Sequence, residues 1–295
     1  TDSLSIDSTS KIDVSGKGYL AGRTLGNTTT GASGYGTGGS YGGLGGIGSN
    51  NYAPNAVYGD FTNPNELGSG GGSGGSGGGL IRITAGSIQL DGEIKSDGGS
   101  AGYSVGAGSG GGIYINVSTI SGVAKITANG GSVSYSWYGG AGSGGGRIAV
   151  YYSDISGFNT ANIMAYGGTG YRNGSGGTVY LKDTLQGLED LIFNNNNASS
   201  SATPLTVTGK TFKSFKVSNS GNVILTGDLV VTGELAIDGG TLSSEQKIQS
   251  GSIVIKNSGL LTHHSTTTTD EYRLEITTDS LSIDSTSKID VSGKG

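Results

Sequence analysis

Apolar and polar side chains alternate in several short stretches of this chain. A period of two residues predicts β-strands with one buried and one exposed face. Four such stretches each follow a Gly-Ser-Gly-Gly segment, and their alternate apolar residues are Ile81/Ile83, Ile113/Ile115/Val117, Ile148/Val150 and Val179/Leu181. We expect equivalent residues, such as Ile83, Ile115, Val150 and Leu181, to stack as one interior ladder.

These stretches recur at a nearly constant distance. The serines of the four segments are Ser76, Ser109, Ser143 and Ser175, which are 33, 34 and 32 residues apart. Each unit continues with two more short strands and ends in a turn such as Asp-Gly or Asn-Gly, residues that accept a positive φ. Three strands per unit predict an all-β fold, a right-handed parallel β-helix (β-solenoid) with long Gly-rich loops on one side. A sandwich of antiparallel hairpins would explain the alternation but not the period.

A longer repeat encloses the shorter one. Residues Thr1–Gly18 occur again without a change as Thr278–Gly295, so the repeat period is 277 residues. We expect the sequence to be an excerpt from a longer tandem array. Tyr272–Ile276 supplies a strand that leads directly into the second copy, so the end of one repeat and the start of the next should form one coil without a linker.

Changes in composition divide the chain into six parts. Leu185–Phe193 is the one stretch that favours a helical turn, within a connection otherwise expected to be irregular. The parts are 1–18 (start of the repeat, a coil), 19–74 (a Gly/Ser/Tyr-rich insertion loop), 75–183 (coils with Gly-Ser-Gly-Gly loops), 184–204 (an irregular connection), 205–277 (tighter coils) and 278–295 (start of the next identical repeat).

Glycine dominates the loops and supplies 61 of the 295 residues. Without Cβ atoms, neighbouring loops can pack backbone against backbone, so a polyglycine-type array and irregular loops both remain open. Aromatic rings punctuate these loops, and we predict a loop contact surface formed by Tyr103, Tyr135, Trp137 and Tyr138. The alternative for these rings is that they cover the glycine loops and give them a small core.

The net charge of −5 excludes a basic surface for nucleic acid, and no apolar run is long enough to insert in a membrane. The absence of cysteine leaves the redox compartment open. The partners expected from the sequence are therefore neighbouring repeats of the same protein, head to tail. Adjacent filaments or surface glycans are further candidates.

Candidate chemistry is sparse. Asp91, Glu93 and Asp97 are close in sequence, but strand alternation places them and Arg82 on different faces, so we predict no catalytic residues. The calcium-binding β-roll motif is absent, because the Gly runs carry Ser where that motif has Asp. We expect no cofactor and no metal site, with Ca²⁺ at a turn such as Asp97-Gly98-Gly99 as the weaker alternative. His263-His264 are expected to be exposed in a loop and not to chelate together.

The stretches GGSGGGLIRITAGSIQLDGEIKSDGG, GSGGGIYINVSTISGVAKITANGG and GSGGGRIAVYYSD resemble Gly-rich tandem repeats of very large secreted or surface proteins of bacteria, which look like β-helical adhesins or fibre formers. The resemblance covers about residues 1–183 and implies an extracellular or cell-surface location, with no catalytic residues to transfer. The function we expect is structural, one repeat of a tandem-repeat β-solenoid in an extracellular filament or surface stalk. An adhesin that binds glycans through loop Tyr and Trp is the alternative, and a β-helix enzyme acting on polysaccharide is the third.

Overall fold

The computed structural model describes residues 1–295, with the exception of the Ser136 side chain. The chain forms three β-sheets, which confirms the all-β class. Helical structure in the described part is confined to short 3-10 turns, η1 (Leu25–Asn27), η2 (Ser136–Tyr138) and η3 (Thr160–Asn162).

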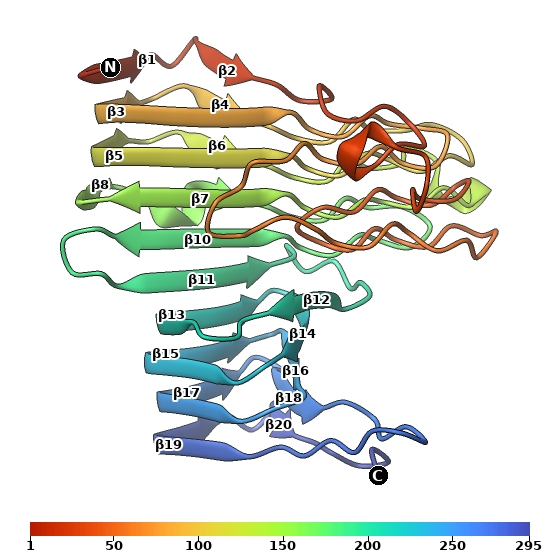
Figure 1. Ribbon diagram of the computed structural model, residues 1–295, viewed down its shortest axis with the longest axis vertical. Coiled ribbons are helices and arrows are strands. Elements are labelled where there is room, and N and C mark those ends of the chain that lie inside the picture. The colour runs from red at the N-terminus through yellow and green to blue at the C-terminus, as the bar shows by residue number, and fades with distance from the viewer.

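One large sheet runs along the whole molecule (Figure 1). Its strands pair in the order β1-β3-β5-β7-β10-β11-β13-β15-β17-β19, and β8 pairs with β5. The bounds are β1 (Ser3–Ile6), β3 (Leu80–Leu90), β5 (Gly112–Gly122), β7 (Arg147–Tyr152), β8 (Asp154–Phe158), β10 (Thr178–Asp183), β11 (Glu189–Asn194), β13 (Thr211–Ser218), β15 (Leu229–Asp238), β17 (Ile248–Lys256) and β19 (Ile276–Ile283).

Two smaller sheets accompany the two halves of the large sheet. The N-terminal one consists of β2 (Lys11–Asp13), β4 (Glu93–Lys95), β6 (Lys125–Thr127) and β9 (Ile163–Met164). The C-terminal one consists of β12 (Thr203–Thr206), β14 (Asn222–Thr226), β16 (Thr241–Ser244), β18 (Leu260–His263) and β20 (Lys288–Ile289). The chain alternates between the large sheet and a small one, so consecutive strands within one sheet come from consecutive sequence units.

The predicted interior ladder is confirmed. Ile83 pairs with Ile115, Ile115 with Val150, and Val150 with Leu181, in parallel register. The first and second strands expected within a unit are, however, continuous in β3 and β5. The reason is that Ala85 and Ser87, on either side of the expected break, also pair with the neighbouring unit.

Among the strands that the structure describes, every pairing is parallel except that of β10 with β11. Leu181 of β10 pairs with Asp190 of β11 in an antiparallel hairpin, so strands from β11 onward run opposite to those before it. The helical turn predicted for Leu185–Phe193 is therefore wrong, and the connection predicted to be irregular over 184–204 contains strand β11 and the start of β12. Residues 189–194 alternate in burial as a strand, and pairing on both sides stabilises them in the sheet.

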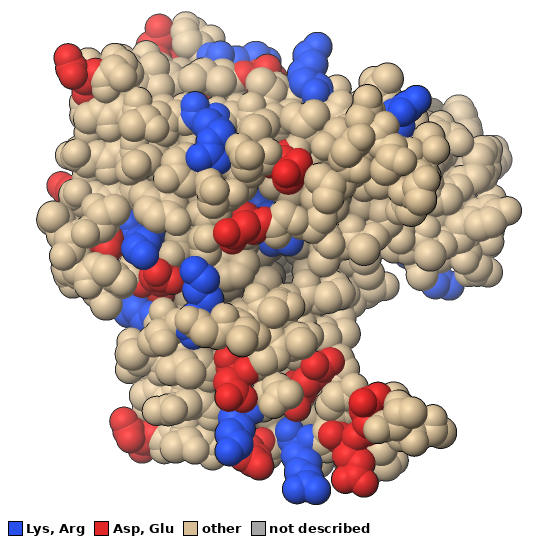
Figure 2. All heavy atoms as spheres, in the orientation of Figure 1, with Lys and Arg blue, Asp and Glu red and all other residues tan. Residues whose placement is uncertain are grey.

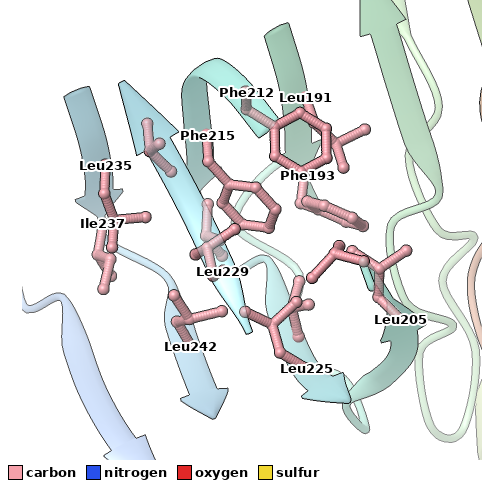
Figure 3. Packing of buried hydrophobic residues seen from close by; sticks show 14 of the residues in the cluster. Leu191, Phe193, Leu205, Phe212, Phe215, Leu225, Leu229, Leu235, Ile237 and Leu242 are labelled. Carbon is pink, nitrogen blue, oxygen red and sulfur yellow. The ribbon is translucent and has the colours of Figure 1, made fainter. Parts of the chain in front are cut away.

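The hydrophobic core changes sides of the large sheet at this hairpin. Val179 and Leu181 contribute to a first core, which also contains residues of the β2–β9 sheet. Tyr180 lies between them on the opposite face and belongs to a second core with residues of the β12–β20 sheet. Leu191 and Phe193 of β11 continue this second core (Figure 3). Strands β10 and β11 consequently contribute side chains to both cores.

Part of the insertion 19–74 covers the outer face of the N-terminal half of the sheet (Figure 1). The Arg82 guanidinium donates to the Pro64 carbonyl at 2.7 Å, and the Tyr151 hydroxyl donates to the Thr62 carbonyl at 2.8 Å. Phe61 packs edge-on against Tyr180 at 5.8 Å between ring centroids. The insertion thereby closes the end of the second core that the N-terminal strands leave open.

Candidate functional site

The Gly-rich segments 34–48, 68–79, 96–112, 128–146 and 165–178 lie side by side and form what we call the glycine platform. It projects from the N-terminal half of the large sheet (Figure 1). Backbone hydrogen bonds connect the segments to one another, and few of their residues belong to strands. This projection is where the sequence places the candidate contact surface, so its construction determines how the aromatic residues are held.

Segment 106–111 shows how the platform is built. Its amides donate in rotation to three neighbouring segments, so that every third amide donates to the same neighbour. The donor–acceptor pairs are Gly106–Gly72 (3.2 Å) and Ser109–Ser69 (2.9 Å), Ala107–Ala141 (3.2 Å) and Gly110–Gly144 (3.0 Å), and Gly108–Gly99 (2.9 Å) and Gly111–Ser96 (2.8 Å). Three residues per turn without internal hydrogen bonds is the geometry of the polyproline II helix.

Segment 141–146 repeats the arrangement one unit later. Its amides also donate to three neighbours with a period of three. The pairs are Ala141–Gly36 (2.9 Å) and Gly144–Gly39 (2.9 Å), Gly142–Arg172 (3.0 Å) and Gly145–Ser175 (2.9 Å), and Ser143–Gly131 (3.2 Å) and Gly146–Ala128 (2.7 Å). Of the two arrangements left open by the sequence, the polyglycine-type array is the one found.

Glycine is required in this array because the segments touch through their backbones. A Cβ on Gly110 would meet the Ala128 carbonyl oxygen, and one on Gly144 would meet the Gly43 carbonyl oxygen. Neither contact involves a side chain that could move away. The glycine content therefore has a packing cause at these positions, beyond the freedom of φ.

Three serines of the Gly-Ser-Gly-Gly segments, Ser109, Ser143 and Ser175, are buried inside the platform, and Ser76 is partly buried. The Ser143 hydroxyl lies within hydrogen-bonding distance of the Gly108 carbonyl at 2.5 Å and the Gly131 carbonyl at 3.0 Å. The Ser109 hydroxyl accepts the Ser69 amide at 2.8 Å. These hydroxyls were missed as functional groups in the sequence, although their recurrence at one position of each unit was visible. They add side-chain hydrogen bonds between segments that backbone hydrogen bonds also connect.

A buried cation fixes the insertion to the platform. The Arg147 guanidinium donates to the Tyr58 carbonyl at 2.8 Å and lies 5.6 Å from the Tyr41 ring centroid. Burial lowers the pKa of Arg147, and burial raises the pKa of Tyr41 to about 12. Tyr41 and Tyr58 pack at 4.9 Å and are the rings that cover glycine segments, as the alternative for the loop aromatics proposed.

The four predicted contact residues come together at the platform and stay exposed. The Tyr103 and Tyr135 rings stack in parallel, with 4.3 Å between centroids and 4° between planes. Tyr138 meets Tyr103 edge-on at 5.1 Å, and Trp137 meets Tyr135 edge-on at 5.6 Å. The Ser104 hydroxyl donates to the Tyr138 carbonyl at 2.8 Å and connects the two loops. Trp137 is 73% exposed and Tyr138 53% exposed. We call Tyr103, Tyr135, Trp137 and Tyr138 the aromatic cluster.

The two loops that carry the aromatic cluster are uncharged. Residues 24–59, 98–124 and 126–146 contain no Asp, Glu, Lys or Arg, and the adjacent platform segment 165–178 contains one charged residue, Arg172. Figure 2 shows the same contrast on one face of the molecule, where charged side chains are sparse over the projecting platform and dense over the C-terminal half. The loops of the cluster therefore offer ring faces, ring edges and phenol hydroxyls, and no ionic group of their own.

Two of the candidate carboxylates, those of Glu93 and Asp97, flank Lys95. Lys95 Nζ lies 3.8 Å from a carboxylate oxygen of Glu93 and 3.8 Å from one of Asp97. Burial raises the pKa of Asp97, although its carboxylate accepts the Asn129 amide at 2.7 Å. Among the residues that the structure describes, no group of three or more His, Cys, Asp or Glu side chains is arranged to hold a metal ion.

The histidine pair differs from expectation. His263 is buried at the end of β18 and is not exposed in a loop. His264 Nδ1 lies 3.5 Å from a Glu245 carboxylate oxygen, and its ring packs 5.2 Å from that of Tyr272. The pairing of Leu260 and Leu261 with β16 extends the strand into the histidines, which is why the polar sequence did not form a loop here.

Comparison with known proteins adds no relative. In the described part of the chain, no helix has the length and apolar character needed to cross a membrane. No protein-family model matches the chain, and no curated protein and no solved structure is similar to it at a significant level.

Proposed function

We propose that this chain is a structural protein, one period of a tandem-repeat β-solenoid that forms an extracellular filament or surface stalk. In this proposal the three sheets are the faces of a right-handed parallel β-helix, and successive repeats continue it head to tail. The role needs no catalytic group, cofactor or metal ion. The Gly-rich sequence, which resembles repeats of large surface proteins, supports the extracellular location.

The change of core at the β10–β11 hairpin supports a continuous helix. Reversing the strand direction alone would reverse the hand of winding. Because the core moves to the other face of the sheet at the same place, the original hand is restored. Parallel strands with crossover connections are overwhelmingly right-handed, so both halves are expected to wind that way.

The observation that carries the proposal is that the two copies of the repeated eighteen residues pair through opposite edges. In the N-terminal copy, β1 pairs only with the strand that follows it in the sheet. Leu4 is opposite Ile88 in β3, and Ile6 is opposite Leu90. The other edge of β1 ends the sheet.

In the C-terminal copy, the same residues pair with the strand that precedes them. Leu281, the counterpart of Leu4, is opposite Ile253 in β17. Ile283, the counterpart of Ile6, is opposite Ile255. The other edge of β19 ends the sheet, and it is the edge that β1 uses.

Superposing the two copies places one strand between β17 of one repeat and β3 of the next. Its inward residues would then complete both cores. Ile6 is already buried under β3, whereas Ile283 is 41% exposed and Leu281 47% exposed at the end of the second core. Joining would bury these side chains and satisfy both open edges, which otherwise favour pairing with other chains.

The strand order predicts the axial length that one repeat adds to the filament. Nine strand-to-strand steps separate β1 from β19 in the sheet order. At about 4.8 Å per step, each repeat extends the filament by about 43 Å. The rod would resist bending through continuous hydrogen-bond ladders and apolar side-chain ladders.

A chain with two consecutive 277-residue periods tests the proposal. Negative-stain microscopy and small-angle scattering should show one straight rod about 43 Å longer than the single repeat. Leu281→Asp at the internal joint should introduce a bend or separate the repeats, because it places a charge between two cores. Ser282→Asp, on the outward face of the same strand, is the matched control and should leave the rod straight. Two compact lobes in variable orientations without any substitution would contradict the proposal.

A further inference from the structure

We infer that the aromatic cluster is a carbohydrate-binding surface for uncharged pyranose polymers. The inference goes beyond the filament role, because it assigns a ligand class to the exposed end of the glycine platform. It is carried by the geometry of the four rings, the absence of charge from the two loops that carry them and the hydrogen-bonded array that holds them.

The rings present the groups that stack on sugars. In the parallel stack, one face of the Tyr103 ring covers one face of the Tyr135 ring, so these two residues offer their ring edges and hydroxyls to a ligand. The Trp137 and Tyr138 rings are both more than half exposed, and they lie 6.0 Å apart at an angle of 47°. Two tilted ring faces next to phenol hydroxyls match a pyranose, which has apolar C–H faces and hydroxyls at its rim.

The charge pattern selects a neutral ligand. The loops that carry the cluster lack Lys and Arg, and the chain has a net charge of −5. An anionic polysaccharide or a nucleic acid would find one cation, Arg172, on the adjacent platform segment 165–178, and would be repelled by the net charge of the chain. A neutral polymer meets no such penalty.

The glycine platform holds the cluster in place. Val133 donates its amide to Thr169 at 2.8 Å, and the Ser134 amide donates to Ala101 at 3.2 Å, so both loops are tied to the array immediately before their rings. Gly140 accepts the Tyr171 amide at 2.8 Å just after Tyr138. Preorganised rings lose less conformational freedom on binding, which favours affinity.

A hydroxyl-rich cluster also argues against a second copy as the occupant. Three of the four rings carry a phenol hydroxyl, and the cluster is confined to two loop ends, Tyr103 and residues 135–138. Stable contacts between folded protein surfaces bury about 800 Å² on each partner, with a dry apolar centre. A chain of sugars needs only consecutive ring faces.

The experiment uses the only tryptophan of the chain as its own reporter, because Trp137 lies in the cluster. Soluble cellohexaose, xylohexaose and mannohexaose are titrated into the complete 295-residue chain, with hexagalacturonate as the anionic comparison. We expect a saturable change in tryptophan fluorescence with at least one neutral oligosaccharide and none with the anionic one. Retention on the matching insoluble polysaccharide gives a second readout.

Two substitutions locate the binding. Tyr138→Ala keeps the fluorescent reporter and should weaken binding about tenfold, and Trp137→Ala, followed by retention and calorimetry, should abolish it. Tyr171→Ala is the matched control, since Tyr171 is 49% exposed but has no ring partner in the cluster. Circular dichroism and thermal unfolding confirm that each variant is folded.

Each adverse outcome is distinct. No fluorescence change and no retention with any neutral sugar overturns the inference, and so does binding that survives both substitutions. Binding of the anionic sugar alone overturns the charge argument. Self-association that disappears in Trp137→Ala, without sugar binding, would assign the cluster to contacts between copies. None of these results bears on the joint between repeats, which is tested separately.

Discussion

The two halves of the large sheet fill the space beside it in different ways. The C-terminal half packs Phe193, Phe212 and Phe215 with leucines and isoleucines, and short turns connect its strands (Figure 3). The N-terminal half has a mainly aliphatic core and adds the glycine platform, in which the segments contact one another through their backbones. The C-terminal half is thus stabilised by packed side chains. The platform, in contrast, can form because its segments carry almost no side chains that would keep the backbones apart.

This comparison shows that one sheet can support two kinds of packing. A side-chain core derives its free energy from buried apolar area, about 25 cal/mol per Å². The platform buries little side-chain area, and its stability depends on hydrogen bonds between the backbones of its segments. The buried N–H and C=O groups have few other partners, so losing one of these hydrogen bonds is costly. Removing a side chain should therefore destabilise the core, whereas adding one should destabilise the platform. Two predictions test this contrast, and a third concerns a carboxylate at the border between the two regions.

The largest effect is expected in the side-chain core. Phe215→Ala should lower the free energy of unfolding by about 3–5 kcal/mol, because a fully buried ring leaves a cavity next to Phe193 and Phe212. Urea denaturation followed by circular dichroism measures the loss. Lys216→Ala, the next residue on the outward face of β13, is the control and should change stability by less than about 0.5 kcal/mol. A similar loss in both variants would contradict the assignment of the core face.

The second effect comes from adding a single methyl group. Gly110→Ala should destabilise the platform by about 2–4 kcal/mol, because its Cβ meets the Ala128 carbonyl in backbone packing that cannot relax. Hydrogen exchange should accelerate at amides that the segment orders, such as those of Gly146 and Gly78. Gly102→Ala has open space for its Cβ and should be neutral. Equal tolerance at both glycines would show that the platform is loosely packed.

The smallest effect concerns a buried charge at the border of the two packings. Burial raises the pKa of Asp97 above its ordinary value of 3.8, so the folded chain binds a proton more tightly than the unfolded one. Stability should therefore fall as the pH rises from about 3.8 through the folded pKa and stay lower above it. Asp97→Asn should remove this decline and raise stability at pH 7 by up to about 1 kcal/mol.

The chain itself contains the precedent for that substitution, because Asn129 occupies the corresponding turn one unit later. Its side chain accepts the Tyr166 amide at 2.8 Å, as Asp97 accepts the Asn129 amide. The measurement is thermal unfolding from pH 3 to pH 8, with Glu93→Gln as the exposed control. Identical pH profiles for Asp97→Asn and the unsubstituted chain would refute the role of burial.

Most of the N-terminal fold was accessible from the sequence. The alternation around Ile83, Ile115, Val150 and Leu181 predicted strands, and the 33-residue spacing predicted their parallel stacking in register. The aromatic cluster was also accessible, because Tyr103 and residues 135–138 occupy the loops of adjacent units. Repetition supplied this information, since equivalent positions of consecutive units must lie side by side.

The hairpin was not accessible in the same way. Leu191 and Phe193 lie on one face of β11 and Ile192 lies on the other, so both faces are apolar. The local sequence therefore did not indicate which face is buried in which core, or whether the strand runs parallel or antiparallel to its neighbours. Only pairing with β10 on one side and β13 on the other established the reversal. The buried histidine is similar, because the parallel neighbour, and not the polar sequence, decided that β18 includes His263.

The sequence by itself determined the repeating units, their strands and the duplicated joint, because these depend on periodicity and on identity between segments. Tertiary structure decided which face of the sheet carries each core, and it decided that the glycine segments form an array. Glycine has no side chain with which to specify a neighbour, so the partner of each amide in segment 106–111 follows only from the packing of the three segments to which these amides donate. The lack of side chains lets the segments pack closely, and it also leaves no side-chain pattern from which the array could be predicted.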